Sequence, residues 1–449
     1  DLDLFMRWYS QAGTPHLKAE GVYDAASRTY ALTLTQHTAP TAGQADKLPL
    51  HIPVAIGLIG PDGADLPLQL EGEVRDGNTT RVLQLRSESQ TWRFTGIDAE
   101  PVPSVLRGFS APVILDIVED DARLAFRMAH DSDSFNRWDA SQRYMERVVL
   151  GLAAAHAAGK PMEVPQAFGL AFRALLVNET LDPAFLAETL ALPSETYLLE
   201  RMQPADPAPL RAALIHLMRE IGHAMQADFL SRYLDLEVEG EYRYHPADAG
   251  KRALRGLCLR YLSAWGGPTA IDLALKQFEH AGNMTERYSA LAALVQSDAP
   301  QRFDALAAFH ERYKDDALVL DKWFQLQAGA WRWSDAAPAT LDQVRALMDN
   351  PAFSLSNPNK VYALLGGYFR ANAAEFHRPD GAGYAFWAEQ VIALNKTNPQ
   401  VASRMARSLE GWRKFTPAIQ AGIRAAFERV SAEEGLSPDV AEIVGKALA

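Results

Sequence analysis

The stretch 357–407 holds the residues best placed for chemistry, because two basic side chains lie near two expected helix beginnings. Asn357-Pro358 and Asn398-Pro399 each predict an asparagine N-cap followed by a proline at the first helical position. Lys360 and Arg404 lie about one or two turns inside these helices. Free N–H groups and cations of this kind favour a bound carboxylate. A pair of capped helices with solvated basic residues is the simpler interpretation, and it stays open.

A second group of residues has the types that ligate a metal ion. His216, Glu220 and His223 fall within about a 60° arc of one expected helix, so three ligand types share a face. The apolar stripe of this helix lies on the opposite side and consists of Leu214, Leu217, Ile221 and Met225. The ligand face is therefore expected to point to water, without the surrounding wall that a tight site needs. An independent metallohydrolase built on these three residues remains an alternative.

The motifs of other known chemistries are missing from the sequence. None of the eleven His residues starts an H-E-x-x-H pattern, since His310-Glu311 is followed by Lys314 where the second His would stand. There is no G-x-S-x-G nucleophile elbow, no P-loop and no G-x-G-x-x-G. We therefore predict neither a catalytic residue nor a metal site within this chain.

Residues 15–129 alternate with a period of two, which predicts β-strands. The clearest strand carries Ile52, Val54, Ile56 and Leu58 on one face. Further strands are expected around residues 32–34, 66–70, 82–85, 92–94, 113–117 and 124–128, with turn signals such as Gly60-Pro61-Asp62-Gly63 between them. Seven or eight short strands of this kind predict an antiparallel, Ig-like β-sandwich domain.

Residues 130–449 have helical spacing almost throughout. Asp133 or Ser134 is expected to cap the first helix, and breaks containing proline or glycine divide the rest into about fifteen helices. Short connections between helices predict antiparallel pairs stacked into a large, irregular α-solenoid of the armadillo or HEAT kind. No fixed-period repeat is visible, and two separate helical bundles are the alternative.

The composition limits the partners and the compartment. The net charge of the 449 residues is −12, with no basic stripe, which argues against nucleic acid and anionic membranes. No apolar run approaches the roughly 20 residues of a membrane span, and no signal peptide is present. The single cysteine, Cys258, lies on the apolar side of an expected helix and is predicted to be a buried, inert thiol. A cytoplasmic protein is expected.

Several short runs resemble the C-terminal region of the bacterial aminopeptidase N family, which are zinc aminopeptidases with a thermolysin-like catalytic domain. Further runs agree in the same order along the whole chain. The runs are Leu4–Pro15, Pro49–Pro53, Phe135–Ala140, Asp321–Phe324, Ser356–Asn359, Gly381–Tyr384, Leu394–Asn395 and Asn398–Arg404. The resemblance covers only the non-catalytic half of the family's chain, and the sequence starts at Asp1 rather than Met. We therefore expect a segment of a longer polypeptide.

The resemblance implies a division of labour between this segment and the rest of the enzyme. Residues 1–14 would be the tail of the missing catalytic domain, 15–129 the β-sandwich and 130–449 the helical domain. The helical domain would cap the active-site cavity and admit short peptides, while the zinc and the catalytic groups lie outside this chain. The partners would be the N-terminal and catalytic domains of the same enzyme. A free-standing α-solenoid that binds peptides or proteins is the alternative.

The resemblance also assigns three substrate-binding candidates. Arg404 matches an arginine that lines the family's cavity on the leaving-peptide side, where it would pair with a peptide carboxylate. Tyr362 stands where relatives can carry another arginine, and this departure leaves its role open. Lys360 is the candidate to replace that charge. The alternative for Arg404 is a surface cation that neutralises a nearby acid such as Glu410.

Overall fold

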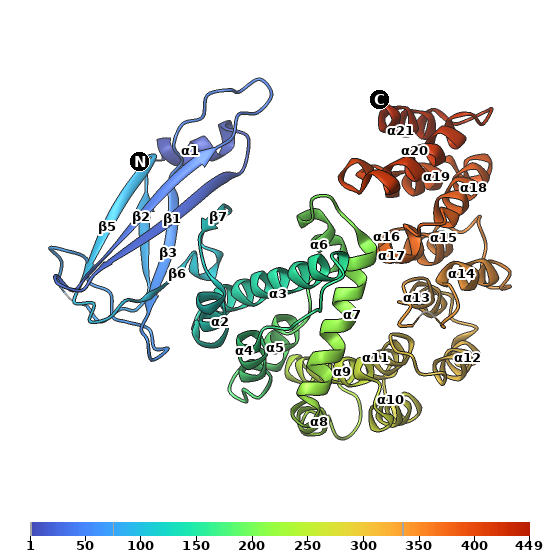
Figure 1. The fold of residues 1–449 in the computed structure, drawn as a ribbon, viewed down its shortest axis with the longest axis horizontal. Helices are drawn as coiled ribbons and strands as arrows, with labels where there is room; N and C mark the ends of the chain where they lie inside the picture. The colour runs from blue at the N-terminus through green and yellow to red at the C-terminus, as the bar shows by residue number, and fades with distance from the viewer. Residues whose placement is uncertain (1, 75, 335) are drawn as a thin grey trace. The chain divides into compact units, whose positions relative to one another are not determined.

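The computed structural model describes residues 2–74, 76–334 and 336–449, so Asp1 of the predicted 1–14 segment lies outside the described residues (Figure 1). The chain forms two compact units. The first comprises Asp1–Met145, Pro165–Leu181 and Glu188–Leu190, and the second comprises Glu146–Val164, Asp182–Ala187 and Ala191–Ala449.

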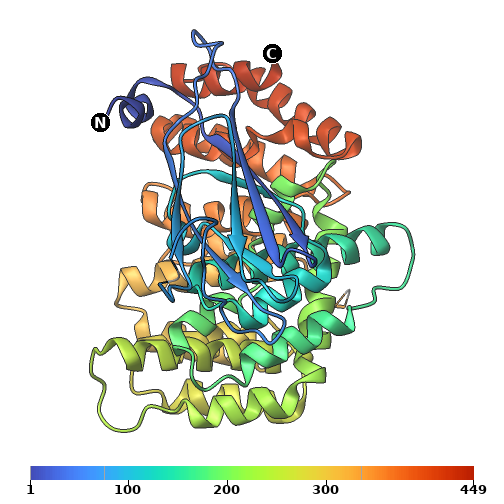
Figure 2. The ribbon, with the colours of Figure 1, turned by 90° about the vertical axis from the view of Figure 1, so that its left-hand side faces the viewer.

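The first unit is built on two β-sheets, whose long strands are seen in Figure 2. The strands are β1 (Pro15–Asp24), β2 (Thr29–Thr38), β3 (Ile52–Ile59), β4 (Arg81–Leu85), β5 (Ser89–Thr95), β6 (Val102–Val105) and β7 (Ile114–Ile117). One sheet has the order β5-β2-β1-β7 and the other has the order β4-β3-β6. The strand pairs are antiparallel except for β1 and β7, which are parallel.

Apolar side chains from both sheets form one core. Leu34 of β2, Ile56 of β3 and Phe94 of β5 are each 0% exposed and belong to the same cluster. The alternation of buried and partly exposed residues along β2 is the pattern expected of a strand with one face on a core. The predicted β-sandwich is confirmed.

Two of the predicted strands are wrong, and strands β1 and β6 were not predicted. Residues 124–128 lie in a helix, α2 (Asp121–His130), whose N-cap Asp120 accepts a hydrogen bond from the Arg123 backbone N–H. Leu124, Arg127 and Met128 are its buried residues, at helical spacing. Residues 66–70 form no continuous ladder, because Pro67 lacks an N–H, and the segment makes a single isolated bridge, between Leu70 and Phe94.

The rest of the described chain is helical, apart from short loops. The helices are α1 (Asp3–Ser10), α3 (Ser134–Ala157), α4 (Gln166–Leu176), α5 (Pro183–Thr189), α6 (Glu195–Arg201), α7 (Pro207–Ala224), α8 (Gln226–Asp235), α9 (Pro246–Trp265), α10 (Pro268–His280), α11 (Met284–Val295), α12 (Arg302–Tyr313), α13 (Ala317–Ala328), α14 (Thr340–Met348), α15 (Pro358–Val361), α16 (Gly367–Ala371), α17 (Ala373–Phe376), α18 (Ala382–Thr397), α19 (Pro399–Ala406), α20 (Pro417–Ser431) and α21 (Pro438–Leu448). Asp133 caps α3 by accepting from the Asn136 backbone N–H at 2.9 Å, as predicted.

The helices of the second unit form a continuous array. Contacts run from α7 to α9 and α11, then through α13 to α16 and α17, and on to α18, α20 and α21. Figure 1 shows these helices following one another in chain order. The predicted irregular α-solenoid is confirmed, and the alternative of two separate bundles is not supported by this chain of contacts.

Two further sequence predictions can be compared with the helices. Cys258 on α9 is 0% exposed, and burial raises the pKa of its thiol to about 12, so it is the inert thiol that was predicted. No helix within the described ranges is both long enough and apolar enough to span a bilayer.

Candidate functional site

The two Asn-Pro sequences begin helices as predicted. The Asn357 side chain accepts hydrogen bonds from two backbone N–H groups of α15, and Pro358 is the first residue of this helix. The Asn398 side chain accepts from the Val401 backbone N–H at 3.2 Å at the start of α19. The short polar side chain supplies an acceptor for donors that have no partner within the helix.

Arg404 and Tyr362 meet, although 42 residues separate them in the sequence. Arg404 Nη1 donates a hydrogen bond to the Tyr362 hydroxyl at 3.0 Å, and the guanidinium carbon lies 5.7 Å from the centre of the tyrosine ring. Arg370 Nη2 donates to the Arg404 carbonyl oxygen at 2.6 Å, which ties α16 to α19. Two of the three predicted site residues are therefore side by side, and the Arg404 side chain is exposed.

Tyr362 begins a π-helical turn, Tyr362–Gly366, between α15 and α16. Such turns insert one extra residue into a helix and occur frequently at functional sites. The turn packs on α13, and Gly367 directly after it allows the close approach. A Cβ at this position would lie 3.1 Å from the Ala328 Cβ of α13.

Lys360 has a different environment from Arg404. Its side chain is 5% exposed, and its ammonium lies 2.7 Å from Asp321 Oδ1 of α13. The ammonium also donates to the Ala317 carbonyl oxygen at 2.6 Å and lies 5.6 Å from the centre of the Phe324 ring. The charge of Lys360 is thus neutralised by the protein itself.

The candidate metal ligands on α7 are not gathered around one point. His216 Nε2 lies 2.7 Å from the Met162 carbonyl oxygen, so this nitrogen carries the proton and donates. The His223 ring is tilted against the Trp265 ring, with 5.8 Å between the ring centres. Within the ranges that the structure describes, no three His, Cys, Asp or Glu side chains are grouped to hold a metal ion.

The expectation that the whole His face of α7 points to open water is wrong for His216. This residue lines a cavity of about 690 Å³ between α7, residues 332–334 and residues 374–380. Arg219, on the same cavity, is paired with Asp298 at 2.8 Å. The lining contains four arginines and two carboxylates, Glu375 and Asp380, so its excess of positive charge disfavours a metal cation.

Two known families match the two parts of the chain. Residues 121–449 match the family described as "Domain of unknown function (DUF3458_C) ARM repeats". The chain belongs to this family. Residues 13–118 match the accompanying DUF3458 domain, described as an Ig-like fold, in agreement with the β-sandwich of the first unit.

The DUF3458 chain is similar over its full length to bacterial proteins named aminopeptidase N. It is 38% identical over 449 residues to the protein of Escherichia coli and 41% identical over 455 residues to that of Caulobacter vibrioides. It is 34% identical over 448 residues to the protein of Haemophilus influenzae. Each match covers 100% of this chain and 50% of the relative, so the chain spans about half the length of these relatives and corresponds to their C-terminal half.

A solved structure supports the same relationship for the DUF3458 chain. The present chain superposes with a TM-score of 0.81 and 27% sequence identity on the crystal structure of Legionella pneumophila aminopeptidase A in complex with aspartic acid. The superposition covers 100% of this chain and 50% of that protein. The fold is therefore that of one half of this aminopeptidase chain.

The sequence reasoning missed two residues that shape the Arg404 region. Asp321 neutralises Lys360, and Arg370 fixes the backbone of α19 through the Arg404 carbonyl. Asp321 lies in a run that was recognised only for its resemblance to the family, and nothing local marks it as the partner of a residue 39 positions later. Pairing across helices leaves no periodic signal in the sequence.

Proposed function

We propose that this chain is the C-terminal part of a zinc aminopeptidase that releases N-terminal residues from short peptides. In this proposal the helical array bounds the active-site cavity and limits access to it, while the catalytic groups lie in the other half of the enzyme. The observation that carries the proposal is that three proteins named aminopeptidase N each match this chain from end to end with half of their own length.

The zinc of the proposed enzyme does not fit the residues of this chain. The sequence has no H-E-x-x-H, and the His216 ring nitrogen is already bonded to the Met162 carbonyl. We therefore assign the metal to the other half of the enzyme and derive no catalytic step from the residues described. The contribution of this chain is enclosure and binding, which keep water and folded proteins away from the reacting groups.

Helix α1 supports the presence of a partner domain. None of its residues is buried. Leu2, directly before it, is 68% exposed, and Phe5, Met6 and Tyr9 are 43%, 52% and 78% exposed. These residues have the i, i+3, i+4, i+7 spacing of a helix face that packs on another surface. We propose that the catalytic domain covers this face, as the assignment of residues 1–14 to that domain implies.

Arg404 is the residue that we propose binds the peptide carboxylate. Among the described residues it forms no ion pair, and Glu410, the acid considered as its partner, lies 3.7 Å from Arg407 instead. Tyr362 fixes one side of the guanidinium by accepting a hydrogen bond, and its own O–H remains able to donate to a second carboxylate oxygen. The ion pair with Asp321 argues against the same role for Lys360.

Reconstitution tests the main proposal. We expect the 449-residue chain alone to bind no stoichiometric zinc and to leave an alanyl chromogenic amide uncleaved. Addition of the separately expressed N-terminal half of the same enzyme should restore hydrolysis. Cleavage by this chain alone would overturn the proposal, and so would a reconstituted complex without activity in which both halves are folded and associated.

A kinetic comparison tests the role of Arg404. In the full-length enzyme, Arg404→Ala should raise KM for dipeptides by about tenfold and leave KM for uncharged amides nearly unchanged, because only the dipeptide carries a carboxylate. Arg407→Ala is the matched control, since Arg407 is exposed, lies three residues away and pairs with Glu410. Equal effects on both substrate types would remove the assignment.

We also propose a cytoplasmic location. The only cysteine is a buried free thiol, so no disulfide stabilises the fold in an oxidising compartment. The net charge of −12 supports neither nucleic acid nor an anionic membrane surface as a partner.

A further inference from the structure

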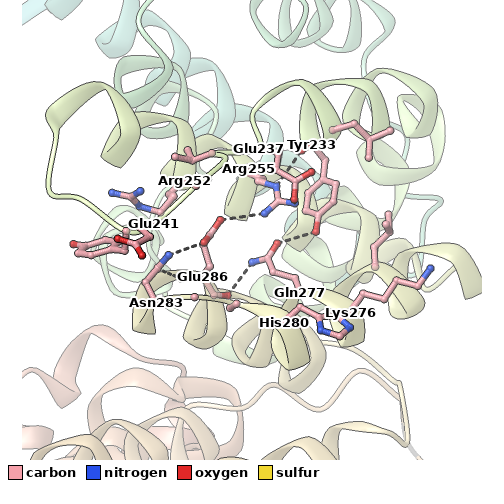
Figure 3. Close-up of a pocket in the computed structure, with 17 residues that line it drawn as sticks. Tyr233, Glu237, Glu241, Arg252, Arg255, Lys276, Gln277, His280, Asn283 and Glu286 are labelled. Carbon is pink, nitrogen blue, oxygen red and sulfur yellow. Dashed lines mark hydrogen bonds and ion pairs between the residues drawn. The ribbon is translucent and has the colours of Figure 1, made fainter.

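Helices α8 to α11 and the loop 236–245 line a cavity of about 440 Å³ in the second unit (Figure 3). This volume falls within the range of small-molecule sites, roughly 300–1,000 Å³. The sequence analysis assigned no role to these residues, and neither the proposed peptidase function nor Arg404 uses them.

One side of the cavity is fixed by a hydrogen-bonded network. Arg255 of α9 is 7% exposed and donates to Glu286 at 3.1 Å and to the Tyr233 carbonyl at 3.1 Å. Asn283 caps α11 and donates to the second oxygen of Glu286 at 2.6 Å, and Gln277 donates to the Glu286 carbonyl at 2.8 Å. The charges of Arg255 and Glu286 therefore neutralise each other, and the hydrogen bonds hold these side chains in a single orientation.

Arg252, one turn earlier on α9, lines the same cavity without such a partner. It is 6% exposed, and its guanidinium lies 5.1 Å from the centre of the Tyr242 ring. Asp248, one turn earlier on α9, interacts with Arg252 electrostatically. No hydrogen bond or ion pair to Arg252 occurs in the described part of the chain, and no dashed line joins it to another lining residue in Figure 3. None of the Arg252 nitrogens is among the fully buried atoms without a partner, so its unused N–H donors face the cavity, where an anion can accept from them.

The remaining charges of the lining indicate which anion fits. Three permanent cations face the cavity, and three carboxylates balance them. The cations are Arg252, Arg255 and Lys276, and the carboxylates are Glu237, Glu241 and Glu286. Figure 3 shows Glu241 on the same side as Arg252. Glu241 has no ion pair among the described residues and is exposed. A balanced lining favours a ligand without net charge that itself carries both signs.

We propose that this cavity binds a small zwitterion, a free α-amino acid or a dipeptide. Its carboxylate accepts the unused donors of Arg252, and its ammonium lies beside Glu241. Leu234, Val238 and Leu273 also line the cavity and receive an apolar side chain. The site lies on the helical array and does not depend on the proposed peptidase role.

Calorimetric titration of the 449-residue chain tests the proposal with four probes. L-Leucine should bind with one-to-one stoichiometry, N-acetyl-L-leucine more weakly and L-leucinamide not at all, because it lacks the carboxylate. Inorganic phosphate should not compete with leucine. Tighter binding of phosphate than of leucine would overturn the zwitterion assignment, and so would the absence of saturable leucine binding.

Two substitutions locate the binding. Arg252→Gln should weaken leucine binding by about tenfold or more, while Arg260→Gln, an exposed arginine on the same helix, should leave it unchanged. Glu241→Gln, on the exposed loop where folding is not at risk, should weaken leucine binding but leave N-acetyl-leucine unaffected. Unchanged leucine affinity in a folded Arg252→Gln chain, judged by its circular dichroism, would overturn the proposal, and so would an equal loss for both probes in Glu241→Gln.

Discussion

Arg127 in the first unit and Arg252 in the second are both buried arginines, and their surroundings differ. Arg127 is 1% exposed and donates to both oxygens of Glu119 at 2.9 Å and to Asp131 at 3.3 Å. Arg252 is 6% exposed and has an aromatic ring beside it but no carboxylate bonded to it within the described residues. The desolvation of the first charge is offset by bonded carboxylates, whereas the second has only the electrostatic interaction with Asp248.

This difference separates two uses of a buried cation. A complete ion pair fixes structure, as the network around Arg127 holds α2 against the end of the sandwich. A buried cation without a bonded carboxylate keeps hydrogen-bond donors that a ligand can use. Lys360, which is paired with Asp321, belongs to the first kind. His377 is a third case, because a buried histidine can lose its proton and then needs no anion to neutralise it.

Arg127→Met should have the largest effect on stability. It removes the cation that the buried Glu119 and Asp131 share, and leaves Glu119 with Arg143 at 2.8 Å and Asp131 with the Ser104 hydroxyl at 3.0 Å. We expect the free energy of unfolding of the first unit to fall by about 3 kcal/mol. Urea denaturation followed by circular dichroism measures this. Arg123→Met on the same helix, whose ion pair with Glu100 is exposed, should cost less than about 1 kcal/mol. Equal losses for the two variants would contradict the comparison.

Lys360→Met should destabilise the second unit by about 1–3 kcal/mol, since Asp321 is left partly buried without its cation. Combining it with Asp321→Asn should recover part of this loss, because no unpaired charge then remains. Urea denaturation of the single and double variants, followed by circular dichroism, measures both changes in unfolding free energy. If the double variant is no more stable than the single one, Lys360 is not held mainly by this pair.

His377 gives a prediction for pH. Burial, and to a lesser extent the charge of Lys414, lowers the pKa of His377 to about 3 from its ordinary 6.5, and its Nδ1 lies 3.0 Å from the Tyr384 hydroxyl. The unfolded chain therefore binds this proton first as the pH falls below 6.5. Stability is fully present above that pH and should decrease toward pH 3 by up to about 1.4 kcal/mol per pH unit.

The measurement for His377 is the slope of unfolding free energy against pH between 6.5 and 4.5. His377→Gln should have a shallower slope than the unsubstituted chain, whatever its absolute stability. Parallel slopes would show that His377 binds its proton as readily in the folded chain as in the unfolded one, which would contradict the lowered pKa.

Arg252→Met should have the smallest effect in the absence of ligand. Asp248, the acid that interacts with Arg252 electrostatically, keeps its ion pair with Arg243 at 3.0 Å. The free energy of unfolding should therefore shift by less than about 1 kcal/mol. Arg255→Met, three residues away in the same cavity, orphans Glu286 and should cost about 2 kcal/mol or more. A cost for Arg252→Met as large as that for Arg255→Met would mean that Arg252 already has a strong partner in the folded chain.

The sequence predicted elements best where the signal was local. The strand through Ile52 and Ile56 and the helix starts at Asn357 and Asn398 follow from alternation and capping, which depend on neighbouring residues alone. The failure at residues 124–128 has a physical reason. Arg127 occupies a core position of α2 because Glu119, eight residues before it, and Asp131, four residues after it, neutralise its charge. One residue of the buried face is therefore polar, and the apolar residues of this segment seemed to alternate.

By itself the sequence determined the order of a β-sandwich and a helical array, the helix starts at Asp133, Asn357 and Asn398, and the family. Only the tertiary structure decided which charges are satisfied. It placed Arg404 against Tyr362, gave Lys360 an acid from another helix and left Arg252 without one. The reason is that backbone hydrogen bonds and amphipathic spacing act over a few residues. A charge, by contrast, is neutralised by whichever group the folded chain brings within a few ångströms.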